Sequence, residues 1–178
     1  MPSTIRRFDI SLADVDHQTY EEVTLRVAQH PSETLAYMLT RIIAYCVHFH
    51  ESVDMSKAGL CNADEPALWK HDLNGNMTHW IDVGLPSTER LHKAAKRAQN
   101  VIVYSHKTLP RLLEQLQAKQ IYRAQDLRAC AIDPKGLQEL ERKIDRTVKW
   151  TVLLTDEILY ITQDELTVSF EINHVPII

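Results

Sequence analysis

Apolar and polar residues alternate one by one near both ends of the chain, which is the pattern of strands with one buried face. Near the N-terminus the apolar positions are 8, 10 and 12 and then 23, 25 and 27, with a polar turn at residues 13–18 between them. This pattern predicts an antiparallel hairpin. Near the C-terminus the alternation runs through residues 148–154, 158–161 and 166–172, with acidic turns between the segments. There it predicts an antiparallel meander.

The segment after the hairpin changes to a helical period. Pro31 and Ser32 open it, and Ser32 is expected to cap the N-terminus of the helix. Apolar residues then recur three and four positions apart, at Leu35, Met38, Leu39, Ile42, Ile43, Cys46 and Val47. A stripe this wide predicts a helix that packs on a sheet.

The middle of the chain carries a β-α-β pattern. Residues 52–58 and 67–71 predict short strands around an irregular connection, and Asn74 with Gly75 predicts a turn. Residues 80–83 predict a strand that ends at Gly84, Ser87 is expected to cap the next helix, and the apolar run 101–104 predicts a central strand. Because a helix connects the last two strands, we expect them to be parallel.

Two further helices are predicted, one at residues 109–119 and one that opens at Asp133 and Pro134. Residues 121–122 and 127–132 predict short strands or loops between them. The whole pattern predicts an α/β fold with α+β character, in which helices flank a mixed central β-sheet. We expect one domain that spans residues 1–178.

The composition is that of a soluble globular protein, because 44% of the 178 residues are hydrophobic and 25% are charged. The longest apolar run is too short to span a bilayer, and the polar first residues predict no signal peptide. Three scattered cysteines without a CxxC pair favour a reducing compartment and predict a cytoplasmic protein. The formal net charge of −4 argues against strong non-specific binding of nucleic acid by the whole surface.

Three acidic residues in the middle of the chain are candidate metal ligands. Asp82 lies near the carboxyl end of a predicted interior strand, where ligands often bind in open α/β sheets. Asp64 and Glu65 precede the predicted strand at residues 67–71. Carboxylates that converge from adjacent strand ends make an oxygen-rich site suited to Mg²⁺. The alternative is that Asp64 and Glu65 are solvated loop acids and that Asp82 caps the next turn.

The helix after Gly84 carries a basic face, because Arg90, Lys93 and Arg97 lie three and four positions apart. Such a face can contact phosphates, although an ordinary solvated outer face is the alternative. The nine histidines form no HExxH or Cys/His zinc pattern, which favours surface or core roles for them. The chain has only four glycines and no glycine-rich phosphate loop.

Three segments resemble motifs of the YaeQ family. They are the sequence HPSET at residues 30–34, GLCNADEP at residues 59–66 with Trp69 close behind, and WIDVGLP at residues 80–86. The resemblance continues through residues 90–94 and covers essentially the whole chain. It implies a PD-(D/E)XK nuclease-like, restriction-endonuclease-like α-β-β-β-α-β core.

By resemblance to those nucleases, Asp64 (or Glu65) and Asp82 would bind Mg²⁺, and Glu33 on the first helix would add an acid. The motif lysine of the superfamily stands two residues after the third-strand acid, where this chain has Gly84. Lys70, Lys93 and Lys96 are the lysines that would replace it. Glu33 has an alternative role, because an acid near a helix N-terminus also interacts favourably with the macrodipole.

Three functional hypotheses follow. The first is a Mg²⁺-dependent phosphodiesterase acting on nucleic acid, with Asp64, Asp82, Glu33 and Lys93 as catalytic residues and Glu65 as a further metal ligand. The second is a catalytically inactive nuclease-fold protein that binds nucleic acid or a protein through Arg90, Lys93 and Arg97. The third, a Rossmann-like small-molecule site at Asp82, is disfavoured by the missing glycine-rich loop.

Overall fold

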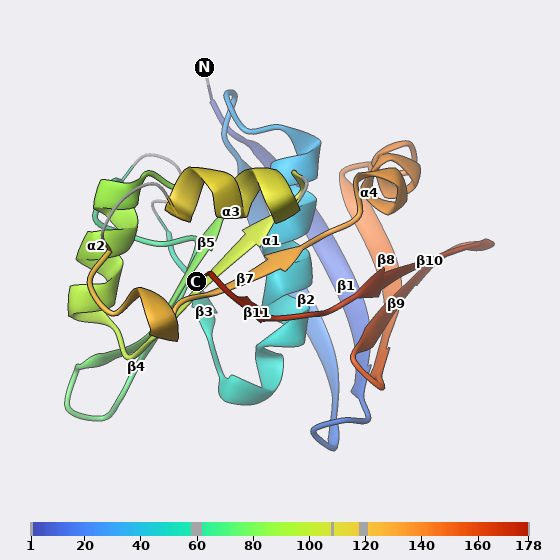
Figure 1. The fold of residues 1–178 in the computed structure, drawn as a ribbon. Coiled ribbons are helices and arrows are strands. Elements are labelled where there is room, and N and C mark those ends of the chain that lie inside the picture. The colour runs from blue at the N-terminus through green and yellow to red at the C-terminus, as the bar shows by residue number, and fades with distance from the viewer. Residues whose placement is uncertain (1, 58–61, 108, 118–120, 178) are drawn as a thin grey trace. The chain divides into compact units, whose positions relative to one another are not determined.

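Two β-sheets organise the chain in a computed structural model that describes residues 2–57, 62–107, 109–117 and 121–177 (Figure 1). The first sheet has the strand order β10-β9-β8-β1-β2, and the second has the order β11-β7-β6-β5-β4-β3. The contacts divide the chain into two compact units. The first unit contains Met1–His50 and Asp133–Ile172, and the second contains Glu51–Ile132 and Asn173–Ile178.

The sheet of the first unit joins the two ends of the sequence. Its strands are β1 (Thr4–Asp14), β2 (Thr19–Gln29), β8 (Thr147–Thr155), β9 (Ile158–Gln163) and β10 (Leu166–Glu171). The β1-β2 pair and the β8-β9-β10 series are antiparallel, so the predicted hairpin and meander are confirmed. A parallel pairing of β1 with β8 merges them into one mixed sheet.

One face of this sheet is apolar and buried. Phe8 on β1 meets Trp150 on β8 edge to face, with ring centroids 5.1 Å apart. Helix α4 (Pro134–Glu141) contacts β10 and also helix α1 (Leu35–Val47), so both helices belong to the core of this unit. Figure 1 shows β8, β9 and β10 as neighbouring strands.

The N-cap prediction for α1 is wrong by two residues. Thr34, rather than Ser32, accepts the hydrogen bond from the backbone N–H of Tyr37, at 3.1 Å. The hydroxyl of Ser32 instead lies 2.6 Å from the ring nitrogen Nδ1 of His30. At α4 the prediction is confirmed, because the side chain of Asp133 caps the helix and proline occupies its first turn.

The second unit is built around the predicted β-α-β pattern. Its strands are β3 (Asp54–Met55), β4 (Leu68–His71), β5 (Met77–Val83), β6 (Asn100–Ser105), β7 (Arg128–Ala131) and β11 (Val175–Pro176). Strands β5, β6 and β7 run parallel, which confirms the predicted orientation of β5 and β6. The two outer pairs on the other side, β3-β4 and β4-β5, are antiparallel, as is β11 with β7.

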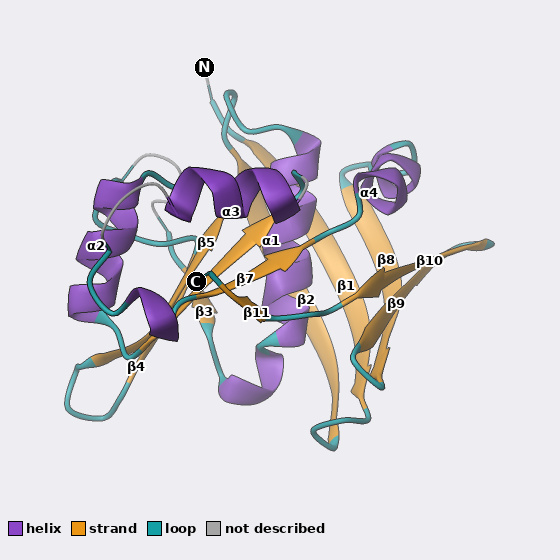
Figure 2. Cartoon of the chain, in the orientation of Figure 1, coloured by secondary structure: helices purple, strands orange, loops and turns teal. Residues whose placement is uncertain are grey.

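Helices α2 (Thr88–Arg97) and α3 (Leu109–Gln117) lie beside this sheet (Figure 2). The side chain of Ser87 accepts from the N–H of Arg90, so the predicted N-cap of α2 is confirmed. Two short 3₁₀ helices, η1 (Phe49–Glu51) and η3 (Ala124–Asp126), complete the described elements. One apolar cluster joins strands and helices and contains Trp80, Leu91, Ala94, Val101, Val103, Leu112, Leu127 and Ala129. This cluster fixes α2 over the face of β5 that carries Trp80.

The structure corrects one feature of the predicted architecture. The sequence pattern predicted a single mixed central sheet, whereas the chain forms two mixed sheets flanked by helices. The parallel pairing of β1 with β8 is the reason, because it joins the hairpin to the meander rather than to the central strands. The single domain spanning residues 1–178 stays a prediction. Among the described residues, no helix combines the length and apolar character that crossing a membrane requires.

Two of the three cysteines are buried, and their reactivity follows from that burial. Cys46 on α1 and Cys130 on β7 are free thiols, and burial raises the pKa of each to about 12. Because the thiolate is the nucleophile, both should resist Ellman's reagent in the native protein. Cys61 lies outside the described residues. We therefore expect a Cys61→Ser variant to show no reactive thiol when native and two when unfolded in guanidinium; rapid labelling of the native variant would contradict the burial.

Candidate functional site

Asp82 lies at the end of β5 and carries the most constrained of the predicted functional carboxylates. It is only 3% exposed and shares a sheet face with Trp80, because alternate residues of a strand point to the same side. Its Oδ2 atom accepts hydrogen bonds from the indole Nε1 of Trp80 and from Nε of Arg90, both at 2.8 Å. Its Oδ1 atom accepts from Nη2 of Arg90, also at 2.8 Å. Arg90 and Asp82 therefore form a bidentate ion pair at a buried strand end.

Arg90 also fastens the loop that precedes β4. Its Nη1 donates to the backbone carbonyl of Ala63 and its Nη2 to the carbonyl of Glu65, each at 2.8 Å. With the two contacts to Asp82, one guanidinium thus connects β5, α2 and this loop. A planar fork with five N–H groups suits such a role, since the other charged side chains offer fewer donors.

Two more basic residues of α2 bind the same loop. Arg97 donates from Nη1 to the carbonyl oxygen of Asp64 at 2.9 Å, and Lys93 forms an ion pair with the carboxylate of Asp64. The guanidinium carbons of Arg90 and Arg97 lie 5.3 and 5.5 Å from the ring centroid of Trp80, within the range of cation–π contacts. The basic residues of the predicted face therefore bind another segment of the same chain.

The structure brings Asp64, Glu65 and Asp82 into one network, but through different groups. Asp64 and Glu65 contribute backbone carbonyls to the arginines, whereas Asp82 contributes its carboxylate. Within the described part of the chain, these three acids do not form a group whose ligand atoms all lie within 4.8 Å of one another. Their role as Mg²⁺ ligands stays a prediction.

The backbone conformation at position 84 favours glycine over the lysine of the motif. The φ angle of Gly84 is +97°, in a region that side chains with a Cβ atom rarely adopt. Its N–H donates to the carbonyl of Tyr104 at 2.8 Å, which continues the contact of β5 with β6. A lysine at this position would strain the backbone. Of the candidate replacements, Lys70 lies on β4 opposite His79, and Lys93 and Lys96 lie on α2.

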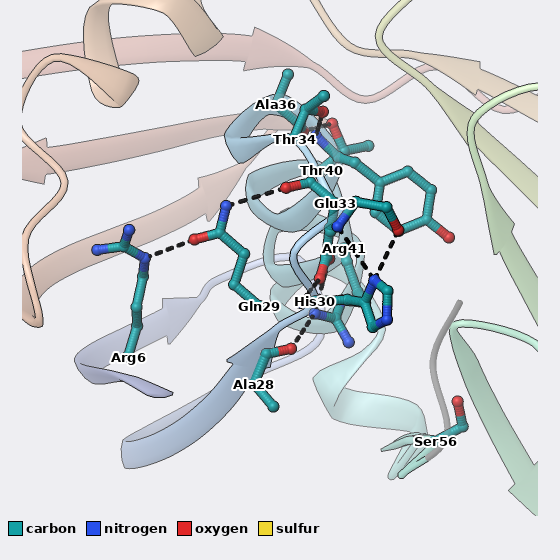
Figure 3. Close-up of polar contacts among 12 residues, drawn as sticks. Arg6, Ala28, Gln29, His30, Glu33, Thr34, Ala36, Thr40, Arg41 and Ser56 are labelled. Carbon is teal, nitrogen blue, oxygen red and sulfur yellow. Dashed lines mark hydrogen bonds and ion pairs between the residues drawn. The ribbon is translucent and has the colours of Figure 1, made fainter. Parts of the chain in front are cut away.

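Glu33 belongs to a separate polar network in the first unit (Figure 3). Its carboxylate is buried and accepts hydrogen bonds from Nη2 of Arg41 at 2.8 Å and from the backbone N–H of His30 at 3.1 Å. Gln29 lies between Arg6 and the backbone carbonyl of Glu33 and hydrogen bonds to both, at 2.9 and 3.0 Å. Burial raises the pKa of Glu33, and the charge of Arg41 opposes that rise. These contacts hold the segment that leads into α1.

The structure contains a second group of potential metal ligands that the sequence patterns did not predict. Asp14, His17 and His50 place one ligand atom each within 4.8 Å of one another. The first two residues lie at the end of β1 and in the following turn, whereas His50 lies in η1. The Asp-x-x-His spacing of the first two is a weak signal, and nothing in the sequence connects them with His50.

Comparisons with known proteins give one consistent result. A sequence model of the YaeQ protein family matches residues 1–172. The uncharacterized protein YaeQ of Escherichia coli K12 is 27% identical over 167 residues, which cover 93% of this chain and 91% of that protein. The uncharacterized YaeQ of Salmonella typhi is 26% identical over 171 residues, covering 91% and 90%.

Two solved structures resemble the fold. The crystal structure of YaeQ from Pseudomonas syringae matches with a TM-score of 0.87 and 28% identity, covering 97% of this chain and 96% of that one. The structure of YaeQ from Xanthomonas axonopodis pv. citri matches with a TM-score of 0.84 and 29% identity, covering 95% and 96%. The likeness therefore extends over both compact units.

Proposed function

Because the chain belongs to the YaeQ family, we propose that it uses a nuclease-like PD-(D/E)XK scaffold to bind nucleic acid without hydrolysing phosphodiester bonds. The observation that supports this proposal is the bidentate pairing of Asp82 with Arg90. A cytoplasmic location, predicted from the scattered cysteines, is part of the same proposal.

The ion pair disfavours metal-dependent hydrolysis at Asp82. Mg²⁺ demands near-octahedral oxygen geometry, and a hydrogen bond from Arg90 already takes one lone pair on each oxygen of Asp82. A divalent cation at this carboxylate would lie close to the guanidinium, so the two positive charges would repel each other. Relief of that repulsion would require Arg90 to move away from Asp82 and from the carbonyls of Ala63 and Glu65.

The motif lysine that would orient water is absent, and its candidate replacement already forms an ion pair. Position 84 is a glycine with positive φ, so no lysine is available two residues after Asp82. Lys93, the candidate replacement, forms an ion pair with Asp64. A phosphodiesterase at this place would therefore need both ion pairs to open before chemistry, whereas phosphate contacts by the exposed Lys96 and Arg97 need neither to open.

The solvent side of α2 supplies the positive charge for binding. Lys93, Lys96 and Arg97 are exposed on it, and the last two lie in the final turn, where cations are favoured by the helix dipole. Two or three phosphate contacts predict a salt slope of about −2 to −3 in a plot of log affinity against log salt. The net charge of −4 keeps the expected affinity modest.

The binding proposal is tested by fluorescence anisotropy with a labelled oligonucleotide at several salt concentrations. We expect salt-dependent binding that Lys96→Glu weakens several-fold, because the change inverts a charge next to the phosphates. Lys135→Glu is the matched control, since Lys135 lies exposed on α4 in the first unit. Equal losses for both variants, or no binding at low salt, would contradict a nucleic-acid site on α2.

The absence of hydrolysis is tested separately. Plasmid and single-stranded oligonucleotides are incubated with the protein and Mg²⁺ or Mn²⁺, and we expect no products above those of a protein-free reaction. Asp82→Asn is prepared in parallel through the same purification, so that a contaminating nuclease would appear in both samples. Metal-dependent cleavage that Asp82→Asn abolishes would establish the enzyme hypothesis and refute the proposal.

A further inference from the structure

Asp14, His17 and His50 of the first unit converge on one carboxylate. Nδ1 of His17 lies 2.8 Å from Oδ2 of Asp14 and 3.0 Å from Oδ1. Nδ1 of His50 lies 3.7 Å from the same Oδ2 atom. The two imidazole rings are stacked, with centroids 3.5 Å apart and planes within 6° of parallel. Two imidazoles and one carboxylate thus share a small volume.

The carboxylate in this group is buried and has no strong cationic partner. Asp14 is 0% exposed, and within the described residues its ion pairs are with the two histidines rather than with a lysine or an arginine. A buried carboxylate is expensive unless it is paired with a cation or bound to a metal. A metal ion held by both rings would supply a fixed counter-charge at this position.

The turn that carries His17 is held in place by hydrogen bonds from backbone N–H groups to the side chains of Asp14 and Asp16. The N–H of His17 donates to Oδ1 of Asp14 at 3.0 Å. The side chain of Asp16 accepts from the backbone N–H groups of Asp156 and Glu157, at 2.8 and 3.0 Å. The turn between β1 and β2 is thereby tied to the turn between β8 and β9, which positions the imidazole beside Asp14.

We propose that Asp14, His17 and His50 bind a divalent transition-metal ion, with Zn²⁺ as the preferred ion. Imidazole nitrogens with one carboxylate oxygen are a ligand set that zinc accepts, whereas Mg²⁺ and Ca²⁺ prefer oxygen alone. The side chain of His17 is 43% exposed and that of His50 is 20% exposed, so water can complete the coordination from the solvent side. A three-residue site of this kind leaves one position open for exchange.

Small movements suffice to form the site. Ligand atoms around tetrahedral zinc lie about 3.3 Å apart at bond lengths of about 2.0–2.1 Å, and the three atoms here lie within 4.8 Å of one another. One ring has to turn out of the parallel stack so that both nitrogens point at one ion. His17 can turn, because its side chain lies in a turn and is 43% exposed. Nδ1 of His50 also lies 3.1 Å from the carbonyl of Val47, a contact that binding through Nδ1 would replace.

The test uses tag-free protein treated with a chelator and then dialysed. Calorimetry with Zn²⁺ and visible absorption with Co²⁺ are expected to show one ion bound per chain. His17→Ala should weaken binding at least about tenfold and remove the Co²⁺ bands, because one of the three ligands is lost. Excess Mg²⁺ should not compete. His17 lies in an exposed turn, and the variant keeps its backbone N–H, which donates to Oδ1 of Asp14.

His71→Ala is the matched control, because His71 is an exposed histidine on β4 of the other unit. It should leave the affinity unchanged, and His50→Ala should reproduce the loss seen for His17→Ala. Zinc binding that His17→Ala and His71→Ala reduce equally would reveal dispersed binding to surface histidines and overturn the proposal. Failure of the wild-type protein to bind Zn²⁺ would overturn it as well, without affecting the nucleic-acid proposal for α2.

Discussion

Replacing Arg90 by methionine is expected to lower the free energy of unfolding by about 3 kcal/mol. Removing one partner of a buried ion pair typically costs about 3–5 kcal/mol, because the other charge remains buried without compensation. Asp82 is 3% exposed, and among the described residues it would keep the hydrogen bond from Trp80 alone. The side chain of Arg90 is 24% exposed, so water reaches the pair and the loss falls at the lower end of that range.

Urea denaturation followed by circular dichroism measures this loss. Lys96→Met is the control on the same helix, and because Lys96 is exposed, its effect should stay within about 0.5 kcal/mol. The double variant Asp82→Asn/Arg90→Met should recover much of the loss, since asparagine keeps an acceptor for Trp80 and carries no charge. Similar stabilities of the Arg90→Met and Lys96→Met variants would show that the bidentate pair contributes little.

The sequence predicts the local elements well, because each of them depends on neighbouring residues. The hairpin β1-β2, the meander β8-β9-β10 and the unit β5-α2-β6 are all confirmed. The parallel pairing of β1 with β8 has no local signature, since it joins strands from opposite ends of the chain. For that reason one central sheet was predicted where two exist. Ser32 and Thr34 are both good capping residues, and only the structure shows which hydroxyl faces the N–H of Tyr37.

The candidate site shows the same limit at the level of side chains. The sequence indicates that Asp82 lies at a strand end and that α2 carries a basic face, and both features are present. It does not predict that Asp82 and Arg90 form an ion pair, because a contact between a strand and the following helix produces no periodic pattern in the sequence. The sequence does not predict the group of Asp14, His17 and His50 for a similar reason, since η1 is distant from β1 in the sequence and only the folded chain brings the three residues together.

Replacing Arg41 by methionine is expected to lower the free energy of unfolding by about 3 kcal/mol at neutral pH. Arg41 and Glu33 are both buried, and their ion pair measures 2.8 Å, so the variant leaves a buried carboxylate without its cation. The Nε atom of Arg41 has no hydrogen-bond partner among the described residues. Methionine removes that buried donor, which reduces the loss toward the lower end of the usual range of about 3–5 kcal/mol.

The loss caused by Arg41→Met should depend on pH in a defined direction. Burial raises the pKa of Glu33 above its ordinary value of 4.5, and Arg41 opposes that rise, so the variant should raise the pKa further. A carboxyl with a raised folded-state pKa contributes stability below the unfolded pKa and loses it as the pH rises through the folded pKa. The deficit of the variant relative to the wild type should therefore be smallest near pH 4.5 and should grow toward neutral pH.

Urea denaturation across this pH range measures the deficit. Compared with Glu33→Gln, the double variant Glu33→Gln/Arg41→Met should show a deficit that does not change with pH, because glutamine does not ionise and still accepts the N–H of His30. A deficit that stays constant with pH would show that Glu33 is not the group that Arg41 neutralises.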